Sequence, residues 1–110
     1  MKILAKKFNG DICSHNMFVM MADVQLKDGA EDDFKKWFSE SNKVLANFPG
    51  FISRRFLKAN DGSYRIIVEH ESKETFIQMH NSPEHDKLHP EGHSYMSSPP
   101  ARKTFSIVAE

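Results

Sequence analysis

The feature that most constrains the fold is a change of hydrophobic periodicity along the chain. Between residues 17 and 26 apolar side chains recur at every second position, which predicts a strand whose one face carries Phe18, Met20, Ala22, Val24 and Leu26. From residue 34 to residue 48 the apolar spacing changes to three and four residues, which predicts an amphipathic helix. Asp28 is expected to cap this helix with Glu31 three residues further on, and Pro49-Gly50 to end it.

Two further strands and a closing strand are predicted from the same kind of pattern. Residues 51–58 and 63–72 are typical of strands, and the sequence Asn60-Asp61-Gly62 between them is a hairpin turn signal. The last strand is expected within residues 103–110. Phe56 is placed on the face of the second strand that points away from the helix.

Charged side chains are expected to face one another across this hairpin. Arg54 and Arg55 on one strand are candidates to pair with Glu69 and Glu71 on the other. Such a set of ion pairs would be structural, so neither arginine is predicted at a functional site.

A second helical region is predicted between the third and fourth strands. Ser72 is a plausible cap for a short helix, and Ser82 followed by Pro83 indicates a restart, since proline is well tolerated at the first helical position. Pro90 and Gly92 are expected to end the second piece.

The resulting order is strand, helix, strand, strand, helix, strand. It predicts an α+β fold of the ferredoxin-like split βαβ type, a four-stranded antiparallel sheet with two helices on one face. We expect one domain over residues 17–110 and a short N-terminal leader over residues 1–16. Both faces of the sheet carry apolar side chains, and two helices cover only one face. A second copy of the chain is the simplest cover for the residues Val19, Met21, Ile52, Phe56 and Ile67.

Composition excludes several classes of partner. Fifteen basic and 15 acidic side chains balance among 110 residues, so the basic excess that nucleic acids and anionic membranes attract is missing, and neither partner is expected. The single Cys13 cannot form an internal disulfide, and the N-terminal segment lacks a signal-peptide pattern. A cytoplasmic protein is therefore expected.

Histidine is concentrated in one stretch, because four of the six histidines lie between residues 80 and 93. His85 and His89 share a helical face, but a helix that ends at Pro90 would separate His93 from them. Two histidines without a third ligand at a known spacing are a weak metal signal, so no metal site is predicted. Imidazole titrates near neutral pH, which makes His85 and His89 candidate proton carriers, while His80 and His93 are expected in solvent.

Four more residues are candidates for contact with a small ligand between the helices and the sheet. Trp37 and Phe38 lie on the stripe of the first helix, and Met79 offers an adaptable apolar side chain. His70 lies on the helix-facing side of its strand. Each could equally be an ordinary core residue, and for His70 a hydrogen bond to a helix end is the simpler interpretation.

The chain resembles the antibiotic biosynthesis monooxygenase family of dimeric α/β barrels. The resemblance covers roughly residues 17–109 and is carried by the stretches VQLKDGAEDDFKKWF, NFPGFISRRFL and VEHESKETFIQMHNSPEHDKL. It implies a homodimer with a pocket between helices and sheet in each subunit. It also implies a cofactor-independent monooxygenase acting on an aromatic or quinol-like small molecule, with a histidine assisting proton removal.

Two alternatives accompany this interpretation. One branch of the family binds and cleaves haem, and the resemblance implies an iron ligand at His89. That branch carries a tryptophan and an asparagine where this chain has Met79 and Ala22. The other alternative is a non-enzymatic dimer that binds a small apolar ligand.

Overall fold

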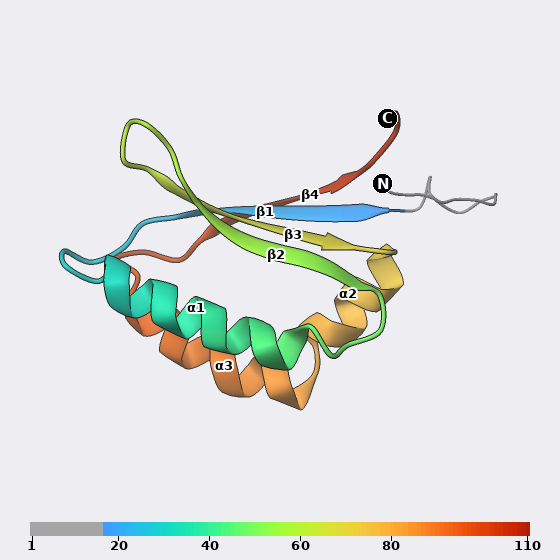
Figure 1. Ribbon diagram of the computed structural model, residues 1–110, viewed down its shortest axis with the longest axis horizontal. Helices are drawn as coiled ribbons and strands as arrows, with labels where there is room; N and C mark the ends of the chain where they lie inside the picture. Colours follow the sequence, from blue (N-terminus) through green and yellow to red (C-terminus); the bar gives the residue numbers. More distant parts are fainter. Residues whose placement is uncertain (1–16) are drawn as a thin grey trace.

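A computed structural model describes residues 17–110 of the protein (Figure 1). The elements come in the order β1 (Phe18–Val24), α1 (Glu31–Leu45), β2 (Phe51–Lys58), β3 (Tyr64–His70), α2 (Lys73–His80), α3 (Pro83–Ser94) and β4 (Ala101–Ser106). The predicted leader, residues 1–16, lies outside the described residues.

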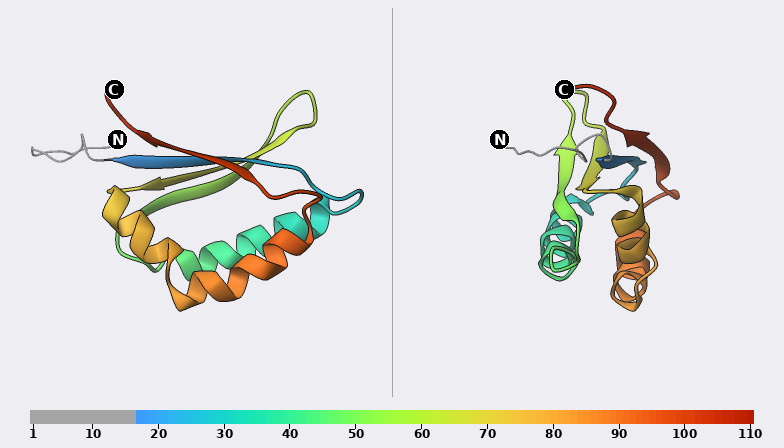
Figure 2. Two further views of the ribbon diagram at one scale, coloured as in Figure 1. Left: turned by 180° about the vertical axis from the view of Figure 1, so that it is seen from behind. Right: turned by 90° about the vertical axis from the view of Figure 1, so that its right-hand side faces the viewer.

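The four strands form one antiparallel sheet in the order β2-β3-β1-β4. All three helices lie on one side of it, with α1 and α3 side by side beneath the sheet and α2 at one end (Figures 1 and 2). This arrangement confirms the predicted ferredoxin-like α+β fold. The sheet is open, and β4 is an edge strand whose residues are all exposed.

The core lies between the sheet and the helices. Phe34 of α1 is its most enclosed aromatic residue, with no exposed surface and with ring centroids of Trp37, Phe38, Phe56 and Tyr95 within 6.2 Å. The helix-facing residues of β1 and β3 complete the core, because alternate strand positions point to the same side. They are Phe18, Met20, Ala22, Val24, Ile66 and Val68.

Strand β2 corrects one sequence prediction. Its register shifts between Phe51 and Ser53, so that Phe51 pairs with His70 but Ser53 pairs with Glu69. The extra residue reverses the facing of the strand beyond it. Phe56 therefore lies on the helix side, with its ring centroid 4.8 Å from that of Phe34, and not on the far face as predicted.

The far face of the sheet carries Val19, Met21 and Ile67 on its central strands, as predicted, next to the ion pairs Arg65–Asp23 and Arg55–Glu69. Cross-strand pairing brings Met21 next to Ile67, and Val19 next to Phe105. Phe105 is 42% exposed. Arg55 pairs with Glu69 on this face at 3.1 Å, as the sequence predicted for that arginine.

The helix ends also differ from prediction at two places. α1 starts after Ala30 without a side-chain cap, because Lys27, Asp28 and Gly29 form a turn in which Gly29 has a φ of 77°. α3 continues through Pro90 to Ser94. The predictions of an Asp28 cap and of a helix end at Pro90 were wrong, whereas Ser72 and Ser82 cap α2 and α3 as expected.

Candidate functional site

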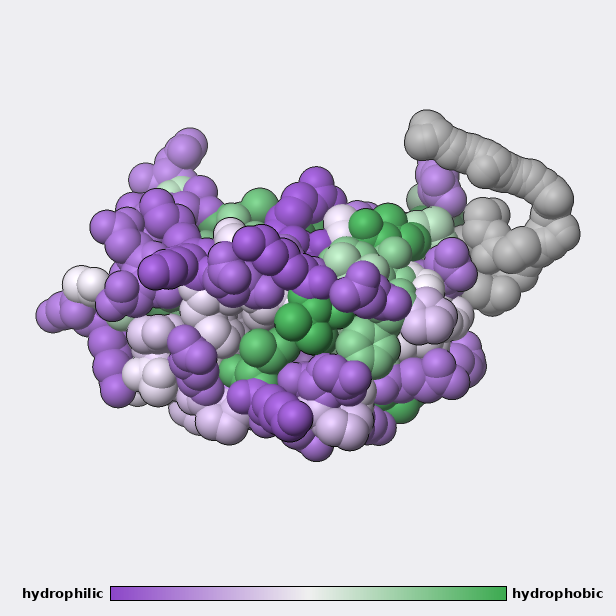
Figure 3. Space-filling view, turned by 60° about the horizontal axis from the view of Figure 1, so that its bottom comes forward, coloured by the Kyte–Doolittle hydropathy of each residue, from purple (hydrophilic) through white to green (hydrophobic). Residues whose placement is uncertain are grey.

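A cavity of ≈ 70 Å³ lies between the sheet and the helices. Its apolar wall comes from β1, β3 and the three helices, and its polar wall comes from histidines and arginines. The lining residues are Met20, Ala22, Trp37, Leu45, Arg54, Ile66, Val68, Phe76, Met79, His80, His85, Leu88, His89, His93, Met96, Pro100 and Arg102. Apolar atoms also gather on the helix-bearing face of the molecule, between polar side chains (Figure 3).

Four histidines of α2 and α3 form a series of ring contacts, and the continuation of α3 through Pro90 adds His93 to it. The ring centroids of His80 and His85 are 4.6 Å apart, those of His85 and His89 5.7 Å, and those of His89 and His93 3.8 Å. We call these four residues the histidine row. All of them line the cavity, so the prediction that His80 and His93 lie in solvent was wrong.

The surroundings of the histidine row lower the pKa of three of its imidazoles, those of His80, His85 and His93. Burial, with a smaller contribution from the positive charges that His80, His89 and Arg54 can carry, lowers the pKa of His85 to about 4. Burial also lowers the pKa of His80 and His93, to which Arg102 contributes. At neutral pH, His85 is therefore an unprotonated imidazole that can accept a proton.

Arg54 of β2 faces His85 across the cavity. Its Nη1 donates to Ser41 Oγ and to Asn42 Oδ1, both at 2.7 Å, and its guanidinium carbon lies 4.1 Å from the centre of the Phe38 ring. Burial lowers its pKa to about 10, so it stays charged at neutral pH. Sequence reasoning missed this residue, because it grouped both neighbouring arginines with the glutamates of β3.

The remaining predicted ligand contacts divide into two groups. Trp37 and Met79 line the cavity together with His85 and His89, whereas Phe38 and His70 do not. Phe38 packs against Arg54. His70 has no exposed surface, and its Nδ1 lies 3.0 Å from Thr75 Oγ1 in the first turn of α2, the helix-end contact that was the simpler interpretation.

Gly92 sets how closely α3 approaches α1. It is buried, and a Cβ atom added to it would collide with the ring of Trp37. A side chain at this position would therefore push the indole towards the cavity. The absence of a side chain at residue 92 allows Trp37 to serve as a flat wall between the two helices.

No group of three metal-binding side chains among residues 17–110 is arranged to hold a metal ion. Helix continuity through Pro90 overturns the argument that His93 is separated from His85 and His89, because the ring centroids of His89 and His93 are 3.8 Å apart. The tilted rings of the histidine row contact one another pair by pair, and no three of them come together around one point as ligands of a tetrahedral site must.

A haem group does not fit these residues as they are arranged. The His89 ring contacts those of His85 and His93, with centroid distances of 5.7 Å and 3.8 Å. The volume of ≈ 70 Å³ is also well below the roughly 300–1,000 Å³ of pockets for drug-sized ligands. Met79 and Ala22 are both in the lining at the positions where the haem-cleaving branch has tryptophan and asparagine.

The lowered pKa values of His80, His85 and His93 predict that the protein is less stable in acid. A histidine whose pKa is depressed in the folded state takes up a proton more readily in the unfolded chain, so stability falls as the pH drops from about 6.5 towards about 4. After allowance for solvent screening, His85 alone should lower the free energy of unfolding by about 1 kcal/mol between pH 7 and pH 5. Urea unfolding of the wild type and of His85→Gln at several pH values measures this. In His85→Gln the free energy of unfolding should vary less with pH than in the wild type, whereas the exposed Lys87→Gln should behave like the wild type. An equal pH dependence of the free energy of unfolding in all three proteins would contradict the lowered pKa of His85.

Comparison with known proteins places this fold and cavity in a family. The model of the antibiotic biosynthesis monooxygenase family matches residues 17–91. The chain belongs to this family. None of the curated protein sequences matches it significantly. No helix within residues 17–110 is long and apolar enough to span a membrane.

Solved structures share the fold at low sequence identity. A conserved protein from Methanosarcina mazei Go1 has a TM-score of 0.78 and 12% identity, covering 84% of this chain and 94% of its own. The cofactor-independent oxygenase SnoaB from Streptomyces nogalater has a TM-score of 0.77 and 16% identity, covering 86% and 96%. A protein from Mycobacterium tuberculosis has a TM-score of 0.75 and 13% identity, covering 86% and 97%.

Proposed function

We propose that the protein is a cofactor-independent monooxygenase that oxidises a hydroxyl-bearing aromatic or quinol-like small molecule. The observation that carries this proposal is an unprotonated imidazole, His85, in a largely apolar cavity opposite a charged guanidinium. Such a site can accept a proton from a phenol and hold the resulting anion away from water. Membership of the antibiotic biosynthesis monooxygenase family and the fold shared with SnoaB support the same reaction class.

The chemistry requires no reductant beyond the substrate. His85 takes the hydroxyl proton, and the electron-rich ring anion forms a carbon–oxygen bond with dioxygen. The proton returns to the outer oxygen of the resulting peroxide. Cleavage of the oxygen–oxygen bond with loss of the ring hydrogen at that carbon leaves a carbonyl and releases water. One oxygen atom enters the product, the other leaves as water, and the substrate supplies all the electrons.

We assign roles to residues according to where they lie. His85 is the base, and His89 is its neighbour in the histidine row and positions it. Trp37 and Met79 hold the substrate ring, with the flexible thioether adjusting to its outline. Phe38 and His70 act indirectly in this proposal, since Phe38 supports Arg54 and His70 supports the start of α2.

Oxygen incorporation tests the proposed reaction. The purified protein is incubated under ¹⁸O₂ with small single-ring phenols and hydroquinones, in keeping with the cavity volume of ≈ 70 Å³, and the products are analysed by mass spectrometry. We expect quinone products that carry one ¹⁸O atom and form at a rate proportional to protein concentration. Heat-denatured protein and anaerobic samples are the controls. Quinones that lack the label, or form equally with denatured protein, would exclude a monooxygenase.

We further propose that the far face of the sheet pairs with the same face of a second copy. Its apolar residues are Val19, Met21, Leu57, Ile67 and Phe105, and no helix of residues 17–110 covers this face. Leu57 and Phe105 are 44% and 42% exposed, whereas Val19 is only 8% exposed. An exposed apolar sheet face of this kind is typical of a subunit interface.

Analytical ultracentrifugation tests the dimer. The wild type should sediment at about twice the chain mass of 12.7 kDa at micromolar concentration. Phe105→Glu should shift it to the monomer, because a carboxylate would be buried unpaired in the interface. Ile77→Glu is the matched control, since Ile77 is also 42% exposed but lies on α2, on the other side of the sheet. A monomeric wild type would contradict the proposal.

A further inference from the structure

The charge of Arg54 has no counter-ion within the part of the chain that the structure describes. Its two side-chain hydrogen bonds go to the neutral oxygens of Ser41 and Asn42, and no carboxylate of residues 17–110 lies within ion-pair distance. Ser41 has no exposed surface. A partly buried cation is costly unless it is paired, so a site that holds one without a counter-ion is suited to an anion from outside.

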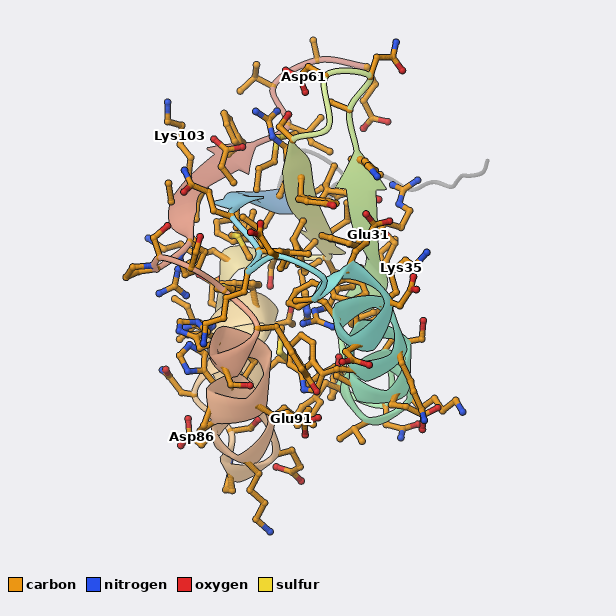
Figure 4. All side chains as sticks on the ribbon, turned by 90° about the vertical axis from the view of Figure 1, so that its left-hand side faces the viewer. Glu31, Lys35, Asp61, Asp86, Glu91 and Lys103 are labelled. Carbon is orange, nitrogen blue, oxygen red and sulfur yellow. The ribbon has the colours of Figure 1, made fainter. Side chains whose placement is uncertain are left out.

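The rest of the cavity has the same electrostatic character. None of its lining residues is Asp or Glu, and a second guanidinium, that of Arg102 on β4, lies 3.2 Å from His80 Nε2 through its Nη1. Asp86 lies on the outer side of α3, away from α1 (Figure 4), and the Glu31 carboxylate at the start of α1 is already bound to Lys58 and Tyr64 of the β2–β3 hairpin. The lining therefore supplies hydrogen-bond donors and positive charge, but no negative charge.

A donor with no acceptor lies next to Arg54. Trp37 Nε1 is buried and has no hydrogen-bond partner among residues 17–110, and the ring lies 5.6 Å from the Arg54 guanidinium carbon. Indole nitrogen can only donate. An acceptor supplied by a ligand would satisfy this group and a remaining N–H of Arg54 together.

We infer that the cavity selects an anionic aromatic ligand, with Arg54 as the residue that recognises its ionised oxygen. The oxygen belongs to a carboxylate or a phenolate attached to the ring, and Trp37 and Met79 contact the ring itself. This inference rests on the proposed function only in that the same cavity would hold the substrate. It narrows the substrate class to ring compounds that bind as anions.

Arg55 provides a matched control for substitutions of Arg54. It is the next residue in the same strand, but it points to the far face and pairs with Glu69 at 3.1 Å. Arg54→Met and Arg55→Met make the same chemical change one residue apart, and only the first removes charge from the cavity. Arg54→Lys retains the charge while losing the planar fork of donors.

Calorimetry at pH 7.5 tests the inference with probes that differ in charge. Benzoate should bind the wild type at least tenfold more tightly than benzamide, its neutral isostere. Arg54→Met should abolish this difference, Arg54→Lys should keep part of it, and Arg55→Met should leave it unchanged. In a second arm at pH 8, 4-nitrophenolate is compared with 4-nitroanisole, which shows whether a carboxylate or a phenolate is preferred.

Two results would overturn the inference. One is that neither anion binds the wild type more tightly than its neutral partner; this result does not depend on whether Arg54→Met folds. The other is an equal anion preference in Arg54→Met and the wild type, with circular dichroism showing both to be folded. Failure of the oxygenase proposal is separable, because these titrations require no turnover. Anion binding without ¹⁸O incorporation would contradict the oxygenase proposal and support the anion site. Incorporation of ¹⁸O without a preference for anions would support the oxygenase proposal and contradict the anion site.

Discussion

Replacing His85 with glutamine should lower kcat for substrate oxidation about 100- to 1,000-fold. General-base catalysis by a positioned side chain commonly contributes a factor of about 10²–10⁴, and glutamine keeps the size and polarity of the side chain without a basic nitrogen. The measurement is the rate of ¹⁸O-labelled quinone formation with the best substrate found for the wild type.

Comparison with two other residues of α3 makes the His85 result specific. His89→Gln should lower kcat at most about tenfold, because we assign His89 a positioning role. The exposed Lys87→Gln should have no effect. The wild-type rate should decline in acid only as the pH approaches about 4, where His85 becomes protonated. Full activity in His85→Gln would remove His85 from the mechanism.

The low pKa of His85 has a consequence for how the base and its substrate are matched. An imidazole with a pKa of about 4 is a weak base for an ordinary phenol. The guanidinium of Arg54 opposite it lowers the pKa of any phenol bound nearby, because it favours the ionised form. Substrate anion and imidazolium would also stabilise each other once the proton has moved. The two residues therefore act as a pair, and Arg54→Met should reduce kcat even where the substrate still binds.

Replacing Phe34 with alanine should lower the free energy of unfolding by about 3–5 kcal/mol. The side chain is fully enclosed by Trp37, Phe38, Phe56 and Tyr95, so truncation loses its burial and leaves a cavity that the neighbouring rings cannot fill. Since domains of this size are commonly stable by about 5–15 kcal/mol, the variant should be close to unfolded at 37 °C.

Urea unfolding followed by circular dichroism measures the loss in Phe34→Ala. Phe34→Leu retains most of the volume and should cost about half as much or less. Ile77→Ala, at a side chain 42% exposed on α2, should cost about 1 kcal/mol or less. A Phe34→Ala protein as stable as Ile77→Ala would show that this aromatic group is not the centre of the core.

The strand and helix order was predictable because periodicity reports which residues face a common core. The alternation in β1 and the three- and four-residue spacing in α1 are local signals, and neither depends on contacts distant in sequence. Met79, His85 and His89 were candidates for a different reason, the chemistry of their side chains and the resemblance to the family, and all three line the cavity.

The parts of the site that were not predictable depend on tertiary structure. Pro90 lacks the N–H for a helical hydrogen bond and usually ends a helix, yet α3 continues because Gly92 packs directly against Trp37 of α1. That continuation places His93 in the histidine row. Arg54 could not be distinguished from Arg55 because the register shift in β2 leaves no local signal in the sequence.

That irregularity in β2 affects how this chain should be compared with its relatives. Phe51 and Arg54 share a face although they are three residues apart, whereas in a regular strand side chains on one face are two apart. In a relative whose second strand is regular, the cavity arginine would follow the residue equivalent to Phe51 after two positions instead of three. An alignment that brings the two arginines together must therefore open a one-residue gap near Ile52, and an ungapped alignment would match the cavity arginine to a residue on the opposite face.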